Sequence, residues 1–446
     1  MPRLFTIALL LVVAFPAMVL AQLTADSPLR TQIEATVVSD LPSLRELYEH
    51  LHANPELSFQ EKETSARIAN EMESLGYDVT TGVGGHGVVA VLRNGEGPSV
   101  MVRADMDALP VQEETGLPYA SAVTATDDQG NEVPVMHACG HDIHMTVFVG
   151  TAKVLTELRE SWRGTLVMIA QPAEERGAGA KAMLDDGLYT RFPRPDYALA
   201  LHVKNDLETG KINYVKEYAC ANVDMVDLTI RGIGGHGAYP HQTKDPIVVA
   251  AEVIVALQTI VSREQDPIDP AVVTVGSIHA GAKHNIIPEE ARLQLTVRTY
   301  SDETRERVLA SIERIATNVA QAAGVPDDLL PTMDIRDEYT PALYNDPALV
   351  DTSVRAIGIM IGEDNVVEGK PTMGGEDFGR YGREEPPVPI FMFGLGTIPS
   401  ERLADYEASG QLPPSLHSSR FQPEPGPTIA TGVKAMTAAV LNLLVP

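Results

Sequence analysis

The 446-residue chain is poor in cysteine, in basic residues and in aromatic residues. Its two cysteines, Cys139 and Cys220, cannot form a disulfide framework, and we expect both to be reduced. Lysine and arginine total 34 against 61 aspartates and glutamates, a formal net charge of −27. A nucleic-acid binder needs a basic surface, so this composition argues against that class. Aromatic residues make up only 5% of the chain, and no aromatic binding pocket can be predicted.

Long apolar runs are also missing beyond the N-terminus. There, Arg3 precedes the apolar run Leu4–Val19, and small residues at positions 19 and 21 suit a cleavage site. We therefore predict a signal peptide over residues 1–21, cleaved after Ala21. An uncleaved membrane anchor is the alternative, although the run is short for a span. The mature protein would be secreted or periplasmic, without a stable membrane span.

The length exceeds what one compact core usually holds, so two domains are expected. Predicted strands and helices alternate along the first half, which is typical of an α/β sheet. Residues 219–338 instead follow the order β-α-β-β-α-β, which indicates a small α+β sandwich with an antiparallel sheet. We predict a main α/β domain of residues 22–218 and 339–446, with helices around a mostly parallel sheet, and an inserted α+β domain.

Residues 135–145 read V-M-H-A-C-G-H-D-I-H-M and contain the densest group of metal-ligating side chains. His137, Cys139 and His141 alternate, so they share one face of an extended segment. A thiolate and an imidazole on one face can bind a divalent transition metal. The alternative for any one of them is a buried cysteine or a surface histidine, but their crowding favours a metal site.

Acidic and histidine side chains also follow the predicted strands, where sites form in open α/β sheets. A helix cap or a surface charge would explain any one of them, but not their recurrence at several strand ends. They are Asp105, Asp107, Glu174, Glu175, His202, Glu376, Asp377 and His417.

Glu174 and Glu175 form the most informative pair. Adjacent carboxylates repel unless a cation or a shared proton relieves them. One can bind metal while the other acts as general base on a bound water, which predicts hydrolysis. A cysteine hydrolase with Cys139 as nucleophile and His137 or His141 as base is a second hypothesis, but it leaves these carboxylates unused. A non-catalytic binding protein is a third, and it would need no base.

Taken together, the motifs resemble those of the M20 metallopeptidase family, in its amidohydrolase branch. That branch contains hippurate hydrolases, N-acyl-amino-acid amidohydrolases and auxin-conjugate hydrolases. The motifs run in order over nearly the whole mature chain. They are Arg103-Ala-Asp-Met-Asp-Ala-Leu-Pro110, His137-Ala-Cys-Gly-His-Asp142, Gln171-Pro-Ala-Glu-Glu175, Leu201-His-Val203, Gly235-His-Gly-Ala238, Asn285-Ile-Ile-Pro288, Gly374-Gly-Glu-Asp-Phe378 and Leu416-His-Ser418.

The resemblance implies a site with two divalent metal ions, manganese or zinc before cobalt or nickel. It implies Glu174 as general base and Asp105 and Asp107 as an acidic pair beside the metals, with Asp107 orienting a ligand. It implies that the inserted domain is a lid and dimerisation domain. The implied metal ligands are Cys139, His141, Glu175, His202 and His417.

The implied reaction is hydrolysis of an N-acyl-amino acid to a carboxylic acid and a free amino acid. A metal-bridging water activated by Glu174 would attack the amide. In this resemblance His236 stabilises the oxyanion from the partner of a homodimer, while Asn285 and Arg298 hold the substrate carboxylate. A secreted metallo-carboxypeptidase or dipeptidase is the alternative. The segment Thr124–Val133 is longer than usual for the branch, and it either lines the acyl pocket or forms a surface hairpin.

Overall fold

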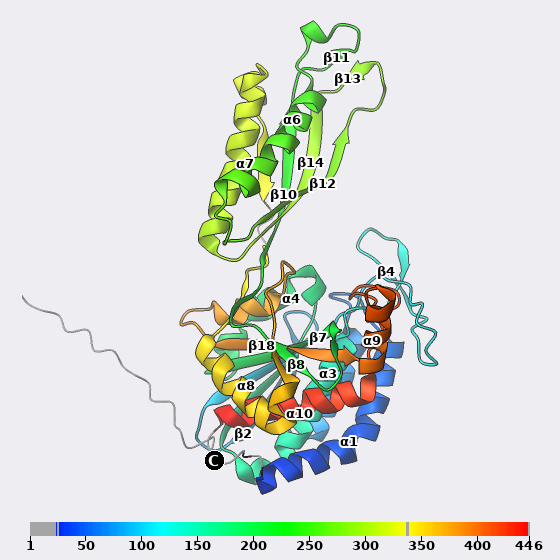
Figure 1. Ribbon diagram of the computed structural model, residues 1–446, viewed down its shortest axis with the longest axis vertical. Coiled ribbons are helices and arrows are strands. Elements are labelled where there is room, and N and C mark those ends of the chain that lie inside the picture. Colours follow the sequence, from blue (N-terminus) through cyan, green and yellow to red (C-terminus); the bar gives the residue numbers. More distant parts are fainter. Residues whose placement is uncertain (1–23, 25, 336–338, 445–446) are drawn as a thin grey trace, which may run out of the picture.

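The computed structural model describes residue 24, residues 26–335 and residues 339–444. The predicted signal peptide, residues 1–21, lies outside these described residues. Two bodies joined end to end make the molecule elongated (Figure 1). The larger body is an α/β structure that contains both ends of the described chain. The smaller body, called the lid from here on, is built from the segment between β9 (Glu217–Cys220) and β16 (Leu343–Asn345).

The larger body is organised around an eight-stranded sheet. Its central strands β6, β3, β7 and β18 are parallel neighbours, whereas β1 and β2 continue one edge antiparallel. Parallel central strands place their carboxyl ends at one edge of the sheet, where a site can form. In spatial order the strands are β1 (Asp78–Val83), β2 (Gly87–Asn94), β6 (Gly164–Gln171), β3 (Ser99–Asp105), β7 (Tyr197–Glu208), β18 (Ile390–Ile398), β8 (Ile212–Tyr214) and β17 (Val366–Glu368).

Helices cover both faces of this sheet, because its central strands are apolar on both sides. In β2, Val88 and Ala90 face one core while Val89 and Val91 face the other. The first core is closed by α1 (Pro28–Ala53), α2 (Lys62–Ser74), α3 (His141–Glu157), α8 (Pro347–Ile361) and α10 (Pro425–Leu443). The second is closed by α4 (Gly179–Asp185), α5 (Leu188–Arg191) and the 3-10 segment η8 (Asp377–Gly382).

The lid has a separate core on one face of a four-stranded antiparallel sheet. Its strands alternate buried and exposed residues, because only that face is covered. Among the described residues, one helix, Pro246–Glu264, is long and apolar enough to cross a membrane by length and composition, but it also packs in this core, so it is weak evidence for a span. The sheet order is β12 (Val272–Ala280), β14 (Glu290–Thr299), β10 (Asn222–Arg231) and β15 (Thr332–Ile335), covered by α6 (Pro246–Thr259) and α7 (Asp302–Ala322).

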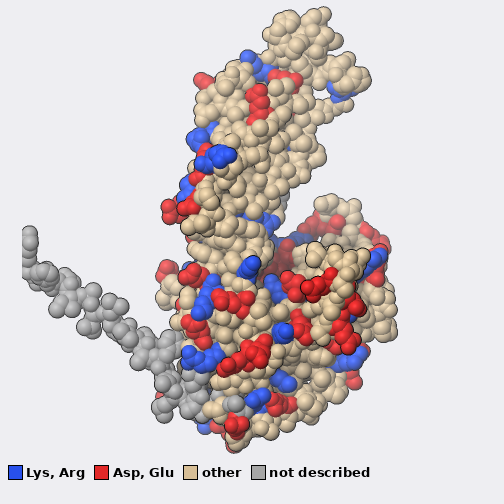
Figure 2. Space-filling model, viewed as in Figure 1, with Lys and Arg blue, Asp and Glu red and all other residues tan. Residues whose placement is uncertain are grey.

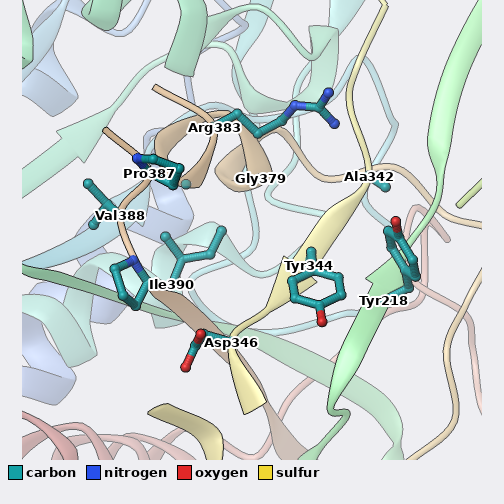
Figure 3. Close-up of a pocket in the computed structure, with 11 residues that line it drawn as sticks. Tyr218, Ala342, Tyr344, Asp346, Gly379, Arg383, Pro387, Val388 and Ile390 are labelled. Carbon is teal, nitrogen blue, oxygen red and sulfur yellow. The ribbon is translucent and has the colours of Figure 1, made fainter. Parts of the chain in front are cut away.

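The two bodies meet where β9 pairs with β16. A pocket of about 330 Å³ lies at this joint, and Figure 3 shows the rings of Tyr218 and Tyr344 on one side of it. Arg383 also lines the pocket and forms an ion pair with Asp302 at the start of α7. The pairing of β9 with β16 therefore holds together the two chain crossings at the base of the lid, and the ion pair between Arg383 and Asp302 links the lid to the larger body.

The predicted fold class, helices around a mostly parallel sheet together with an α+β unit, is confirmed. The strands β1, β8 and β17 and the exposed helix α9 (Ser400–Ser409) were not predicted. β8 and β17 have only three residues each, β1 buries only Val83 among its six residues, and α9 has no buried residues, so none of them carries a clear apolar periodicity. The segment 124–133 forms the short hairpin β4 (Thr124–Thr126) and β5 (Glu132–Pro134).

Candidate metal centre

The candidate centre lies at the carboxyl ends of β3 and β6 and beside the middle of the longer neighbouring strand β7, which contains His202 instead of ending before it as predicted. Cys139 and His141 come from the turn that begins α3, with Gly140 between them at φ +79°. A Cβ on Gly140 would lie 2.7 Å from a methyl carbon of Val203, so a side chain there would both strain the backbone and collide with β7. Glycine at this position thus lets the turn approach the middle of β7, where His202 lies.

The structure brings the five predicted metal ligands together. Cys139 Sγ lies 3.5 Å from His202 Nε2 and 3.3 Å from His417 Nε2. Glu175 Oε1 lies 3.4 Å from His417 Nε2 and 3.9 Å from His141 Nε2. Two groups of ligand atoms share Cys139. One contains His141 and His202 and the other contains Glu175 and His417, and within each group the ligand atoms lie within 4.8 Å of one another. A shared central thiol between two such groups suits two ions.

Hydrogen bonds orient two of the histidines toward this space. Nδ1 of His141 lies 2.7 Å from the carbonyl oxygen of Asp107, and Nδ1 of His202 lies 2.8 Å from that of Val203. A carbonyl only accepts, so each Nδ1 carries the proton and each Nε2 has a lone pair free for a metal. Nε2 of His141 and Oε1 of Glu175 are buried and have no hydrogen-bond partner among the described residues. A divalent cation would satisfy both atoms, and the donor set fits zinc-like ions.

The protonation of Cys139 also points to a cation. Burial, together with the carboxylates of Glu175 and Glu174, raises the pKa of this thiol well above its ordinary value. Without a metal the site therefore holds a neutral thiol, which is a poor nucleophile. A metal ion would reverse that electrostatic balance and stabilise the thiolate as a ligand.

Glu174 and Glu175 are held by their own backbone. Their N–H groups both donate to the carboxylate of Asp107, at 3.1 Å each, and the hydroxyl of Ser58 donates to the same carboxylate at 2.6 Å. The preceding residue, Ala173, has a positive φ of +51°. Asp107 thus fixes the loop after β6 and also bonds His141 through its carbonyl, which is the orienting position expected from the sequence.

The side chain of Glu174 is buried beside the ligands. Burial raises the pKa of Glu174 well above its ordinary value, and the nearby carboxylates of Glu376 and Glu175 add to the shift. A carboxylate in such surroundings can accept a proton near neutral pH, as a general base must.

Comparison with known proteins now bears on this geometry. The family model for Peptidase family M20/M25/M40 matches residues 101–408. Hippurate hydrolase of Campylobacter jejuni is 38% identical over 334 residues, which cover 74% of this chain and 82% of the relative. The chain belongs to the M20 peptidase family.

Two further relatives place it within this family. An IAA-amino acid hydrolase of Arabidopsis thaliana is 37% identical over 331 residues, covering 74% of this chain and 72% of the relative. The crystal structure of a dinuclear metal binding peptidase of the M20 family from Bacillus subtilis aligns with a TM-score of 0.72 at 30% identity, covering 90% of this chain and 98% of that one. This M20 protein is a metal-dependent amidohydrolase with a centre suited to two divalent ions.

Several residues of the M20 site had no assigned role in the sequence reasoning. His144 donates from Nδ1 to Asp105 at 2.6 Å and accepts the N–H of Val203 at Nε2, at 2.9 Å, so it fixes the end of β7 next to His202. The carboxylate of Asp105 also accepts a hydrogen bond from Arg103, and it lies 3.6 Å from Nε2 of His141. The spacing of three residues between His141 and His144 on one helix could have suggested this neighbour.

A second network of buried side chains connects α3 to α1. His52 on α1 lies 2.7 Å from Asp142 and 3.1 Å from Glu113, and all three side chains are almost inaccessible. Burial opposes charge on His52, but the two bonded carboxylates outweigh it and raise its pKa to about 10. His137, predicted only as part of the cluster, is buried, belongs to none of the ligand groups found among the described residues, and has a pKa lowered to about 4 by burial.

The three residues that the resemblance places in the lid are separated in the structure. Arg298 lines the cleft above the ligands. His236 and Asn285 instead line a recess at the far end of the lid, where β11 (Gly235–His236) pairs with β13 (Ile286–Ile287) (Figure 1). Within one chain, therefore, Asn285 and Arg298 do not share a site, and His236 does not reach the metals.

Proposed function

We propose that the protein hydrolyses the amide bond of N-acyl-amino acids to a carboxylic acid and a free amino acid. The observation that carries this proposal is a buried base, Glu174, in the same cleft as a cation, Arg298, that has no carboxylate partner among the described residues. The cleft has a volume of about 480 Å³, enough for a small acylated amino acid. The names of the relatives, hippurate hydrolase and IAA-amino acid hydrolase, support the same substrate class.

Bound divalent ions would lower the pKa of a water and polarise the substrate carbonyl. Glu174 accepts the proton of that water on its carboxylate as the water attacks the carbonyl carbon. Its raised pKa lets it hold the proton and then donate it to the departing amine nitrogen, as the amide bond breaks. Cys139, His141, Glu175, His202 and His417 would hold the ions, for which we propose zinc or manganese.

Arg298 would bind the carboxylate of the amino-acid part. Its Nε donates to the hydroxyl of Thr296 at 2.9 Å and Nη1 donates weakly to the carbonyl of Met373 at 3.4 Å. Its polar partners among the described residues are these two oxygens and no carboxylate, and burial lowers its pKa. A half-buried guanidinium with free N–H groups in an active-site cleft is suited to a substrate carboxylate.

We also propose a homodimer formed through the lid. β12 lies at the edge of the lid sheet with an unpaired side, and α6 exposes the apolar side chains of Val248 and Val255, which are 54% and 71% exposed. Both features suit pairing with a second copy. The dimer would bring His236 and Asn285 to the partner's cleft.

His236 has the protonation state that this role requires. Its Nδ1 accepts the N–H of Ala238 at 3.0 Å, so in the neutral ring the proton is on Nε2. Nε2 is then a hydrogen-bond donor that can stabilise an oxyanion. A secreted or periplasmic location, with the signal peptide cleaved after Ala21, completes the proposal.

The test is a hydrolysis screen of N-acyl-amino acids and dipeptides with metal-loaded protein. We expect turnover of acylated amino acids, and a loss of at least ~10² in turnover in Glu174→Gln with both ions retained. The matched control is Glu114→Gln, because Glu114 is a half-exposed carboxylate that does not line the cleft. Exclusive turnover of dipeptides, or normal turnover in Glu174→Gln, would contradict the proposal.

A further inference from the structure

The metal cleft contains a second cation that the reaction does not use. Lys204 follows His202 by two residues on β7, so both side chains are on the same face of the strand. It is half-buried and lines the cleft together with Arg298. A Cβ on Gly394 would come within 2.9 Å of Lys204 Cγ, so the lysine stem lies over that glycine of the neighbouring strand β18. Its position is thus set by the sheet that carries the ligands.

Lys204 has no carboxylate partner among the described residues, which is unexpected in this protein. Acidic residues outnumber basic ones by 61 to 34, so most cations can find a partner. Arg176, the third cation of the cleft, is an example, because it pairs with Asp128 at 2.5 Å. Figure 2 shows the surface notched where the lid meets the larger body, with basic side chains at the notch. Two unpaired cations, Lys204 and Arg298, therefore face this cleft from different bodies.

A second recess adjoins the cleft at Lys204. Its lining includes Lys204, Lys370 and the polar side chains of Asn213 and Tyr214 beside apolar residues such as Met392, and it shares His202 with the cleft. Lysine and amide groups around a recess next to the reacting centre suit an anionic group better than an apolar one.

We propose that Lys204 is a specificity-determining residue that binds a second carboxylate, so that the preferred substrates are N-acyl-amino acids with two carboxylates. This inference rests on the proposed function, in which Arg298 holds the first carboxylate. The second carboxylate is on the side chain of the amino acid, as in N-acylglutamate, or on the acyl group, as in N-succinyl-amino acids. Both present the same chemistry to Lys204, and substrate choice separates them.

The experiment measures kcat/KM for two matched pairs of substrates. N-acetyl-L-glutamate is compared with N-acetyl-L-glutamine, and N-succinyl-L-alanine with its succinamoyl analogue, so that the second member of each pair keeps the first carboxylate and lacks the second. We expect the wild type to favour the dicarboxylate in one pair, and Lys204→Met to lower that preference roughly 10- to 100-fold. Lys204→Arg should keep most of it. Lys62→Met, which changes an exposed lysine of α2, should leave it unchanged.

A preference that is the same in Lys204→Met as in the wild type would overturn the inference, as would a preference for the monocarboxylate in both pairs. A uniform loss of turnover for all four substrates would also contradict it, since it would show a role in the chemistry. If the monocarboxylates are hydrolysed normally and the dicarboxylates are not preferred, only this inference fails. If metal-loaded protein hydrolyses none, the proposed function fails.

If no substrate is hydrolysed, a binding measurement tests the Lys204 contact separately from the proposed function. The same four compounds are titrated into metal-loaded Glu174→Gln, with and without Lys204→Met. Tighter binding of the dicarboxylate by about 10-fold, lost in the double variant, would support the Lys204 contact whether or not turnover is seen. Equal affinities in the two proteins would overturn it.

Discussion

Replacing Arg103 should strongly lower the free energy of unfolding of the larger body. Its side chain on β3 has no solvent exposure. Its guanidinium donates to Gln171 at 3.0 Å, to Asp105 at 2.6 Å, to Glu376 at 2.9 Å and to Asp377 at 3.0 Å. One cation thus contacts three buried carboxylates that come from both ends of the larger body's sequence.

Arg103→Met would keep much of the apolar volume but leave these carboxylates without their cation. Breaking a buried ion pair by removing one partner typically costs ~3–5 kcal/mol. Whole domains have free energies of unfolding of ~5–15 kcal/mol, so this is a large fraction of the total. The loss should be smaller at pH 5 than at pH 8, because the stranded carboxylates can take up protons at the lower pH. Arg103→Lys should lose less, since it keeps the charge without the planar fork.

Urea unfolding of metal-free protein, followed by tryptophan fluorescence, measures this effect. The only tryptophan, Trp162, is 1% exposed and lies in the core of the larger body, so its emission reports that body rather than the lid. A decrease below ~1 kcal/mol for Arg103→Met, or an equal decrease at both pH values, would refute the reasoning.

Cys139 should react slowly with an alkylating reagent in metal-loaded protein and faster after chelation, as measured by mass spectrometry. Alkylation that abolishes turnover while both ions stay bound would instead support Cys139 as the nucleophile. The folded pKa of His52, about 10, exceeds its unfolded value, so its stabilisation is complete below about pH 6.5 and lost as the pH rises toward 10. His52→Gln should flatten that part of the stability profile, and an unchanged slope would be contrary evidence. Mixing inactive His236→Ala with inactive Glu174→Gln should restore part of the activity through mixed dimers, and no recovery despite subunit exchange would place His236 outside the partner's site.

The region of the site could be predicted from sequence because metal-ligating side chains cluster locally, whereas the choice of ligands came from the family resemblance. Cys139 and His141 are crowded into one turn, and Glu175 follows the apolar strand β6, although His202 lies within β7 and not after it. Parallel strands then bring these positions to one edge of the sheet without further information.

Other parts of the site depend on contacts that sequence spacing does not reveal. Arg103 and Glu376 are 273 residues apart, and nothing near either one indicates the other. The same holds for His52, which bonds Asp142 although the two residues are 90 positions apart in the sequence. His236 lies at the far end of the lid, at the opposite end of the lid strands from Arg298. The sequence does not show this separation, which appears only in the structure.

The metal content of the active protein tests the dinuclear centre most directly. Elemental analysis of purified wild-type protein, matched to turnover on the same sample, should give two divalent ions per chain. Glu175→Gln should contain fewer ions and Glu174→Gln the full number. Full turnover in wild-type protein that chelation has freed of both ions would contradict the centre described above.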